Sequence, residues 1–397
     1  MTAPRTAPRH DRDDRGGQRG FTLIELTIGM LLTGIILSFV FIVSGKMSTA
    51  YFGQAQVADV QQTLRTVRAA IAADVRQAGF FVSNGFRTAA FGDTAELVRP
   101  LQIVNNADGS GPDVVRVYYA DATAGSRVRS IDEAERGFAD IDSTASFAEG
   151  DVVVMVNSAI TPAGENNGTG QVVYAACVVR VTAIDAGAPG RLYFAADGDG
   201  APYNTADNPQ CAEVASATAN EDPVPDTVVY RFAGRSYRID PQRKEQGVLQ
   251  GSPSGEMVEG DWTDLALGVT TIQTASRYFE DGDAVDLDGD GDPELDWYSA
   301  EGQETPDPTG ERPAGASLIE LRVSVEARTQ RGTRSVPTSR TTNMSDDDQP
   351  AHNPVGDWPG VQLAGVANDE RPEGYGGDHI YRSAEALIDL RNLGVGE

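Results

Sequence analysis

The sequence predicts an α+β protein in which a long N-terminal α-helical spine packs on an antiparallel β-sheet globular domain. Two features support this fold class. No proline occurs between residues 21 and 99, although the chain of 397 residues contains 21 prolines, so one long helix can occupy this stretch. Beyond it, runs of β-branched and aromatic residues alternate with Gly, Asn and Asp clusters, which is typical of strands joined by turns.

The N-terminus combines a basic segment with a membrane-length apolar run. Residues 1–20 contain five Arg and three Asp, and Glu25 is the one charged residue in the apolar run, residues 21–43. As a helix this run is about 34 Å long, enough to cross a bilayer. The Arg-rich flank should stay in the cytoplasm, with the remainder of the chain outside. A secretory signal would have a shorter apolar core and a small-residue site after it, whereas here Gly20 precedes the run.

Glu25 needs an explanation, because a carboxylate at the centre of a membrane helix costs about 2.5–3.5 kcal/mol. The stretch "RGFTLIEL", which contains Gly20, Phe21 and Glu25, resembles the class III signal of type IV prepilins and type II secretion pseudopilins. The resemblance implies that prepilin peptidase cuts between Gly20 and Phe21 and methylates the new N-terminus. It also implies an assembly contact between the α-ammonium of Phe21 and Glu25 of a neighbouring subunit. The alternative is a signal anchor in which the acid has no role.

After Lys46 the helical pattern becomes amphipathic. Apolar residues recur at spacings of three and four, at Val57, Val60, Leu64, Val67, Ile71 and Val75, as on a helix with one apolar stripe. We therefore expect one helix from about Phe21 to about Ala78, with residues 21–45 in the membrane, residues 46–80 amphipathic, and Gly79 as the C-cap. The stripe should pack against the sheet.

Residues 81–397 should form the β-rich globular domain. We expect a hairpin at residues 228–239 that turns near Ala233 and Gly234. Strands are expected at residues 113–120, 151–157, 171–184, 191–196, 317–328 and 380–392. Residues 305–316 and 337–378 read as loops, and the second is longer than compact domains usually contain. Residues 84–226 match no family pattern, so their topology is not predicted.

Several stretches resemble the PilW-type minor pilins of type IV pili. The spine ends in "DVRQAGFF", residues 74–81, and residues 262–283 resemble a strand of that family leading to an Asp-rich turn. "ELRVSVEART" and "ALIDLRN" resemble its last strands. This resemblance implies a pilin-like fold and a non-enzymatic structural subunit that helps to initiate or cap a pilus. The presence of Glu25 then implies that another subunit sits above this one.

The composition argues against other functions. The formal net charge is −27, and a nucleic-acid-binding surface needs the opposite sign, so no nucleic-acid partner is expected. The chain has three His, none in a recognisable catalytic or metal-binding motif, and no nucleotide-binding glycine motif. We therefore do not expect an enzyme.

Cys177 and Cys211 are the two cysteines of the chain. They are too few for a disulfide scaffold and lack zinc-ligand spacing. A bridge between them would close a loop of about 35 residues and stabilise the fold by roughly 3–4 kcal/mol, and two buried free thiols are the alternative. The oxidising periplasm that the pilin resemblance implies favours the disulfide.

The stretch "DLDGDGDPELDW", residues 286–297, is a candidate calcium loop. Calcium takes six to eight oxygen ligands, and oxygen-bearing side chains recur here at Asp286, Asp288, Asp290, Asp292, Glu294 and Asp296. Gly291 occupies the sixth position, as in an EF-hand loop, but Trp297 replaces the glutamate expected at the twelfth. A solvated acidic turn is the alternative.

These interpretations place the chain in the inner membrane of a Gram-negative-type bacterium, as a single-pass protein with a cytoplasmic N-terminus. From there it would enter a pilus fibre at the cell exterior. The expected partners are prepilin peptidase, other minor pilins and the major pilin. Two alternatives share the signal: a J-type minor pseudopilin of a type II secretion system, and a pilin-anchored calcium-dependent adhesin.

Overall fold

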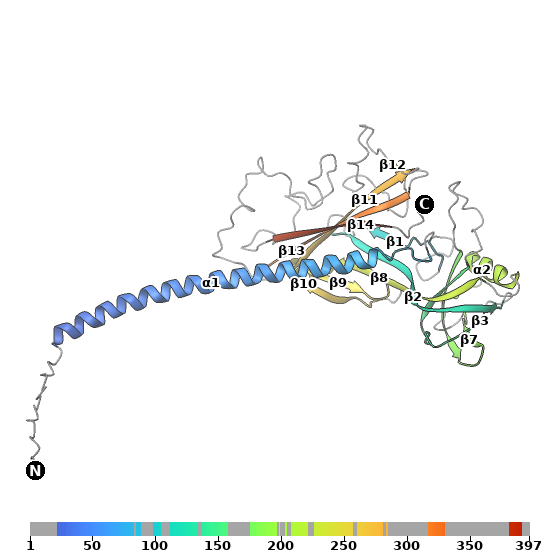
Figure 1. Cartoon of the computed structure of the whole chain (residues 1–397), viewed down its shortest axis with the longest axis horizontal. Helices are drawn as coiled ribbons and strands as arrows, with labels where there is room; N and C mark the ends of the chain where they lie inside the picture. Colours follow the sequence, from blue (N-terminus) through green and yellow to red (C-terminus); the bar gives the residue numbers. More distant parts are fainter. Residues whose placement is uncertain are drawn as a thin grey trace, which may run out of the picture. The chain divides into compact units, whose positions relative to one another are not determined.

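The structure is a computed structural model of the whole chain (Figure 1). It divides into two compact units, Met1–Gln54 and Ala55–Glu397, which are described separately below. The structure describes residues 22–82, 85–88, 98–104, 112–132, 137–157, 175–196, 198, 203–204, 208–220, 226–256, 260–280, 283–284, 317–329 and 381–390.

Helix α1, Leu23–Val75, forms the predicted spine. In the first unit, described residues 22–52 are all exposed, and the helix is long and apolar enough to cross a membrane. The helix ends three residues before the predicted end at Ala78, because the chain tightens there: the amide of Ala78 donates to the carbonyl of Val75, at 3.0 Å. Gly79 then adopts a left-handed backbone with φ of 78°, as expected of a residue that terminates a helix.

In the second unit, the apolar stripe of α1 is buried against two antiparallel sheets. Val60, Leu64, Val67, Ile71 and Val75 are all buried, and Val57 is half-buried. This confirms that the amphipathic half of the helix packs on β-structure. A common core joins these side chains to strands of both sheets, including Leu101, Val115, Val117, Ile239, Leu249, Ile272, Leu321, Val323 and Ile388.

The larger sheet has ten strands, with the central order β10-β9-β8-β2-β3-β7-β6. β1 pairs with β2, while β4 lies between β8 and β5. The strands are β1 (Leu101–Val104), β2 (Val114–Ile131), β3 (Phe138–Ile141), β4 (Val152–Asn157), β5 (Ala175–Arg180), β6 (Ala183–Asp185), β7 (Gly190–Tyr193), β8 (Thr227–Ile239), β9 (Val248–Ser252) and β10 (Thr263–Leu267). A 3-10 turn, Lys244–Gln246, links β8 to β9.

The smaller sheet has four strands in the order β12-β11-β13-β14. They are β11 (Val269–Glu280), β12 (Asp283–Ala284), β13 (Ser317–Arg328) and β14 (Tyr381–Asp389). β13 has the predicted bounds, and β14 closes the sheet as expected by pairing with β13. The predicted loops at residues 305–316 and 337–378 lie outside the described residues.

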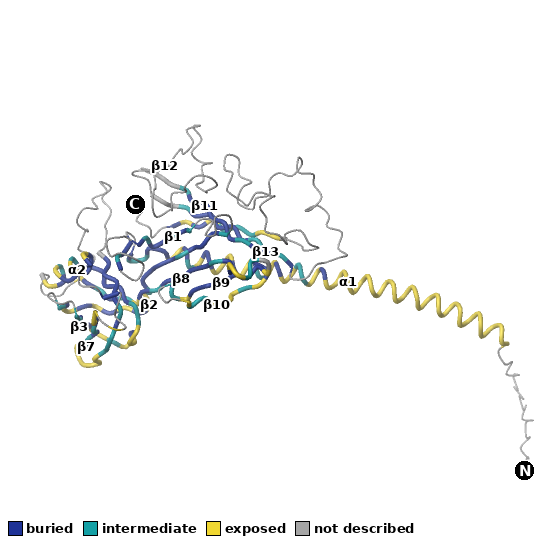
Figure 2. Tube along the Cα trace, turned by 180° about the vertical axis from the view of Figure 1, so that it is seen from behind, coloured by how far each residue is buried: buried dark blue, intermediate teal, exposed yellow. Residues whose placement is uncertain are grey.

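Two further cores use strands of the larger sheet, which Figure 2 shows as largely buried along their length. One lies under helix α2 (Pro209–Asn220) and contains Val128, Ile141, Met155 and Leu192. The other core is aromatic. The ring of Phe86 makes T-shaped contacts with the rings of Phe232 and Tyr118, with centroids 4.7 and 5.4 Å apart. Alternate residues of β4 and β5 enter opposite cores, because side chains alternate between the faces of a strand.

The hairpin predicted at residues 228–239 is wrong, because this stretch forms the single strand β8. Gly234 suggested a turn, but its lack of a side chain instead lets the backbone of another loop lie close to β8. A Cβ atom at this position would lie 2.5 Å from the carbonyl oxygen of Ser254 and 2.9 Å from the Cα of Gly255. The loop between β9 and β10 therefore lies directly on β8, and Tyr118 fixes it by donating a 2.8 Å hydrogen bond to the Gly255 carbonyl. Glycine inside a strand often marks such a contact.

The other differences between the predicted and the observed strands are smaller. The strand predicted at residues 113–120 extends to Ile131. In the strand predicted at residues 171–184, the described part is divided into β5 and β6. Helix α2 falls in the stretch for which the sequence offered no topology.

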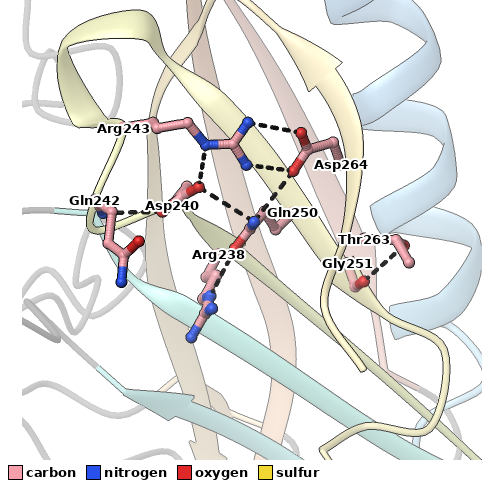
Figure 3. A network of polar contacts seen from close by, with 8 residues as sticks. All are labelled: Arg238, Asp240, Gln242, Arg243, Gln250, Gly251, Thr263 and Asp264. Carbon is pink, nitrogen blue, oxygen red and sulfur yellow. Dashed lines mark hydrogen bonds and ion pairs between the residues drawn. The ribbon is translucent and has the colours of Figure 1, made fainter. Parts of the chain in front are cut away.

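A polar network joins the ends of β8, β9 and β10 (Figure 3). Arg243 donates two hydrogen bonds to Asp264, of 2.8 and 2.6 Å, and one of 2.5 Å to Asp240. Gln250 donates to both carboxylates, at 3.2 and 3.1 Å. The bonds from Arg243 and then Gln250 lower the pKa of Asp264 from 3.8 to about 2. The network holds the edge strand β10 against its neighbour.

We expect Gly234→Ala to destabilise the globular unit by about 1–3 kcal/mol, because the added methyl group overlaps backbone that cannot move independently. Gly137→Ala is the matched control, since its Cβ would approach nothing closer than 3.9 Å. Thermal and urea unfolding of the two variants would test this. Equal stability of both would contradict the close-approach interpretation.

The pKa of Asp264 predicts a loss of stability in acid. A carboxyl group whose pKa is lower in the folded state stabilises the fold above its unfolded pKa, near 3.9. That contribution is lost as pH falls from about 4 to about 2. The thermal midpoint of wild type should therefore fall more steeply over this range than that of Asp264→Asn. Asp59→Asn, at an exposed position of α1, should retain the wild-type slope, and parallel curves for all three proteins would refute the prediction.

Candidate functional site

The N-terminal end of α1 carries a reciprocal hydrogen-bond pair between Thr22 and Glu25. The Glu25 carboxylate accepts from the backbone amide of Thr22 at 3.4 Å and from its hydroxyl at 3.3 Å. In return, the Thr22 hydroxyl accepts from the backbone amide of Glu25 at 3.3 Å. This is a capping box, which satisfies amides that have no partner within the helix.

The capping box changes the interpretation of Glu25 as an acid without a partner. Its charge is partly satisfied within its own chain, at the helix end where a negative charge is also favoured by the helix dipole. The spacing Thr-x-x-Glu is visible in the sequence as a capping signal. The capping signal is short, and the apolar run that follows it favours the interpretation of Glu25 as an unpaired acid in a membrane helix.

The hydrogen bonds that hold Glu25 are long and come from neutral donors. The carboxylate accepts two hydrogen bonds, of 3.4 Å from the Thr22 amide and 3.3 Å from the Thr22 hydroxyl, and both are longer than is usual for such donors. Thr22 and Glu25 are both exposed. A cation could therefore reach the carboxylate and form a shorter, charge-assisted bond. The predicted processing residues Gly20 and Phe21 lie outside the described residues.

The apolar side chains that follow Glu25 are exposed along the helix. Among the most exposed are Leu31, Phe39 and Phe41, at 65–73%. Such a surface on every side of a helix is stable only in lipid or among other apolar helices. The first unit thus pairs one acid at its start with a helix that must be surrounded by apolar groups.

Cys177 and Cys211 form a disulfide in the structure, which is the pairing that the sequence predicts. It links β5 to the first turn of α2, and both side chains are buried. Asn208 caps α2 by accepting from the Gln210 amide at 3.1 Å, and its own amide donates to the carbonyl of Arg87 at 2.7 Å. The disulfide and this cap fix both the position and the start of α2.

The six predicted calcium ligands, Asp286 to Asp296, lie outside the described residues. Among the residues that the structure does describe, no group of three or more His, Cys, Asp or Glu side chains is placed to hold a metal ion.

Comparison with known proteins supports the interpretation of the N-terminus. Residues 15–41 match the prokaryotic N-terminal methylation motif, which covers Gly20, Phe21, Thr22 and Glu25. No curated protein matches the chain. A solved structure of a type IV-like pilin from Thermus thermophilus is similar, with 12% identity, 85% of this chain and 98% of that chain covered, and a TM-score of 0.27.

A TM-score of 0.27 is too low for a detailed structural comparison, so we consider the motif and the observed architecture alone. A methylation motif leads into a long N-terminal helix, and the described domain after it is built on antiparallel sheets. The methylation motif therefore stands at the start of the long helix, and the described fold is the α+β arrangement that the sequence predicts.

Proposed function

We propose that this protein is a minor pilin, a structural subunit that helps to initiate or cap a type IV pilus. The observation that carries the proposal is the methylation motif at residues 15–41, placed so that Glu25 lies in the first turn of a membrane-length helix. Prepilin peptidase would cut between Gly20 and Phe21 and methylate Phe21. The processed chain would wait in the inner membrane and then enter the fibre.

Docking would exchange the partner of Glu25. Before assembly, the carboxylate is held by the neutral donors of Thr22. After cleavage, the α-ammonium of Phe21 on a neighbouring subunit could replace them with a charge-assisted bond, which is shorter and roughly twice as strong. Because the surroundings are apolar, leaving either charge unpaired is costly. The exchange therefore favours a docked neighbour and sets its register.

The capping box would also stabilise the processed subunit in the inner membrane before assembly. A bare carboxylate at the centre of a membrane helix would cost about 2.5–3.5 kcal/mol. At Glu25, two hydrogen bonds from Thr22 to the carboxylate reduce the cost of carrying the charge in the membrane. Glu25 can thus remain charged while the subunit is in the membrane, and can bind a neighbouring ammonium once the subunit is in the fibre. Other minor pilins and the major pilin are the proposed partners in the fibre.

The test is the number of surface pili, counted by electron microscopy. Cells lacking the protein should have few or no pili, and wild-type protein should restore them. Glu25→Ala should fail to restore them, because no acceptor remains for the neighbouring ammonium. Asp59→Ala is the matched control: it removes one exposed acid from the same helix and should restore the wild-type number. Normal pili in the deletion strain would overturn the proposal.

Mass spectrometry of the purified protein decides the processing step. The proposal requires a mature chain that begins with N-methylated Phe21, in wild type and in Asp59→Ala. A chain that still begins at Met1 would support the signal-anchor alternative. Processed protein together with normal pili and lost protein secretion would instead identify a type II secretion pseudopilin, which shares the motif.

Calcium binding by residues 286–297 is a separate proposal, on which the adhesin alternative depends. The acidic residues follow β12 in the sequence, and a bound cation would neutralise their mutual repulsion. Calorimetric titration of the purified protein should show saturable binding at or below about millimolar calcium. The variant Asp288→Asn/Asp290→Asn should weaken it. No saturable heat in that range would exclude the site.

A further inference from the structure

The exposed apolar surface of α1 continues beyond the apolar run that the sequence marks. Met47, Tyr51 and Phe52 follow that run and are 63–71% exposed. The rings of Tyr51 and Phe52 lie next to each other, with centroids 6.2 Å apart. Lys46 is the one charged side chain in residues 26–58. A surface this apolar is stable against lipid or other apolar groups, so the surroundings that cover the run must also reach these residues.

The distance from Glu25 to Tyr51 matches the thickness of a whole bilayer. These residues are 26 positions apart, which is about 39 Å along a helix. A bilayer has a hydrocarbon core of about 30 Å and measures about 40–45 Å with its headgroup layers. With Ser38 at the midplane, Glu25 and Tyr51 each lie about 5 Å outside the hydrocarbon core. Both polar groups are then among lipid headgroups, at opposite surfaces of the membrane.

The types of residue fit these depths. Lys46 lies about 12 Å from Ser38 along the axis, just inside the hydrocarbon core, where a long lysine side chain can extend its ammonium to the headgroups. Tyr51 combines an apolar ring with a hydroxyl that stays hydrated, and such side chains are enriched at the membrane–water interface. Val57, with which the buried stripe of the second unit begins, lies about 9 Å beyond Tyr51, outside the headgroup layer.

An apolar groove runs along one face of this part of the helix. Its lining includes Phe39 at one end, the small side chains of Ser44 and Ser48, and the rings of Tyr51 and Phe52 at the other end. From Phe39 to Phe52 the groove is about 20 Å long. One leaflet contributes about 15 Å of hydrocarbon, so a groove of this length reaches from the middle of the membrane to the headgroups.

We propose that residues 39–52 of α1 bind phospholipid of the periplasmic leaflet, with an acyl chain in the groove and the rings of Tyr51 and Phe52 among the headgroups. Two observations select lipid as the occupant. The groove has the length of one leaflet, and Lys46 carries the charge that attracts lipid phosphate. The inference rests on the membrane stage of the proposed function and adds a contact that the assembly role of Glu25 does not use.

Such an anchor fixes the depth of the subunit before assembly. A deeper position would bury the hydroxyl of Tyr51 in hydrocarbon, which is costly without a hydrogen-bond partner. A shallower position would expose the rings of Tyr51 and Phe52 to water. Glu25 therefore stays level with the cytoplasmic headgroups, where its charge costs less than at the membrane centre.

The experiment measures depth on the purified full-length chain in vesicles of phosphatidylethanolamine and phosphatidylglycerol. A single cysteine that carries a nitroxide label replaces Leu32, Ser38, Ser48 or Ala58. The native cysteines are joined to each other and do not take the label. Spin resonance then compares collisions with oxygen, which concentrates in hydrocarbon, and with a water-soluble nickel complex.

The inference predicts that the label at Ser38 is the deepest. Its ratio of oxygen to nickel collisions should exceed that at Ala58 at least about tenfold, because Ala58 lies outside the bilayer. Ser48 should also be protected from nickel. If the apolar run alone set the depth, its central residue Leu32 would be deepest instead, and Ser48 would be as open to nickel as Ala58.

Variants in the labelled proteins decide whether the two rings set the depth. Tyr51→Ala/Phe52→Ala should move the deepest position towards Leu32 by at least one helical turn, about 5 Å. Tyr51→Trp/Phe52→Trp should keep the wild-type depth, since tryptophan also favours the interface. Phe39→Ala/Phe41→Ala is the matched control, because it removes two exposed rings near the membrane centre and should leave the depth unchanged.

Four results would overturn the inference: a deepest position at Leu32 in the wild type, no shift in the Tyr51/Phe52 alanine pair, an equal shift in the control pair, or dipolar broadening between labels at Ser48. The last result would identify a second copy, and not lipid, as the occupant of the groove. A label at Ser38 that nickel reaches freely would also overturn the membrane stage of the proposed function. The pilus count with Glu25→Ala tests the assembly contact separately.

Discussion

The fold depends on one contact, the burial of the apolar stripe of α1 between two sheets. Leu64, Ile71 and Val75 are at most 3% exposed, and the core that contains them takes residues from the larger sheet and the smaller sheet alike. Each fully buried Val, Leu or Ile contributes about 1.5–3 kcal/mol. Because the two sheets share this stripe, the core between them cannot form without the helix.

Polar contacts fix the arrangement that the stripe makes possible. Asp113, which is 1% exposed, precedes β2 and accepts hydrogen bonds from the amide and hydroxyl of Thr274 in β11, at 2.8 and 2.7 Å. It therefore ties the larger sheet to the smaller one. Burial, and then the hydrogen bond to Asp74 of the helix, raise the pKa of Tyr237. A buried polar group that is fully bonded specifies one geometry, since a misplaced neighbour would leave it unsatisfied.

The same helix has two different surroundings along its length. In the second unit one face is buried by the protein itself, while in the first unit every described residue from 22 to 52 is exposed. That exposed apolar surface requires lipid or other apolar helices, and Glu25 at its start is capped by Thr22 of the same chain. The helix thus contributes to the core of the second unit and presents a fully exposed apolar surface in the first.

Periodicity and motifs determined much of this protein from the sequence alone: the spine, its apolar stripe, strand β13, the processing signal and the cysteine pair as a candidate disulfide. These features are local, or repeat at a fixed spacing, so neighbouring residues reveal them. Tertiary structure decided what depends on distant contacts. Gly234 lies in a strand because β8 pairs with β2, and it is a glycine because Ser254 lies too close for a Cβ atom. The strands divide between two sheets that both contact the helix, and α2 is held by Cys211 and Asn208. The spacing Thr-x-x-Glu in the sequence indicates that Thr22 can cap the helix with Glu25. The helix geometry then brings the two side chains together.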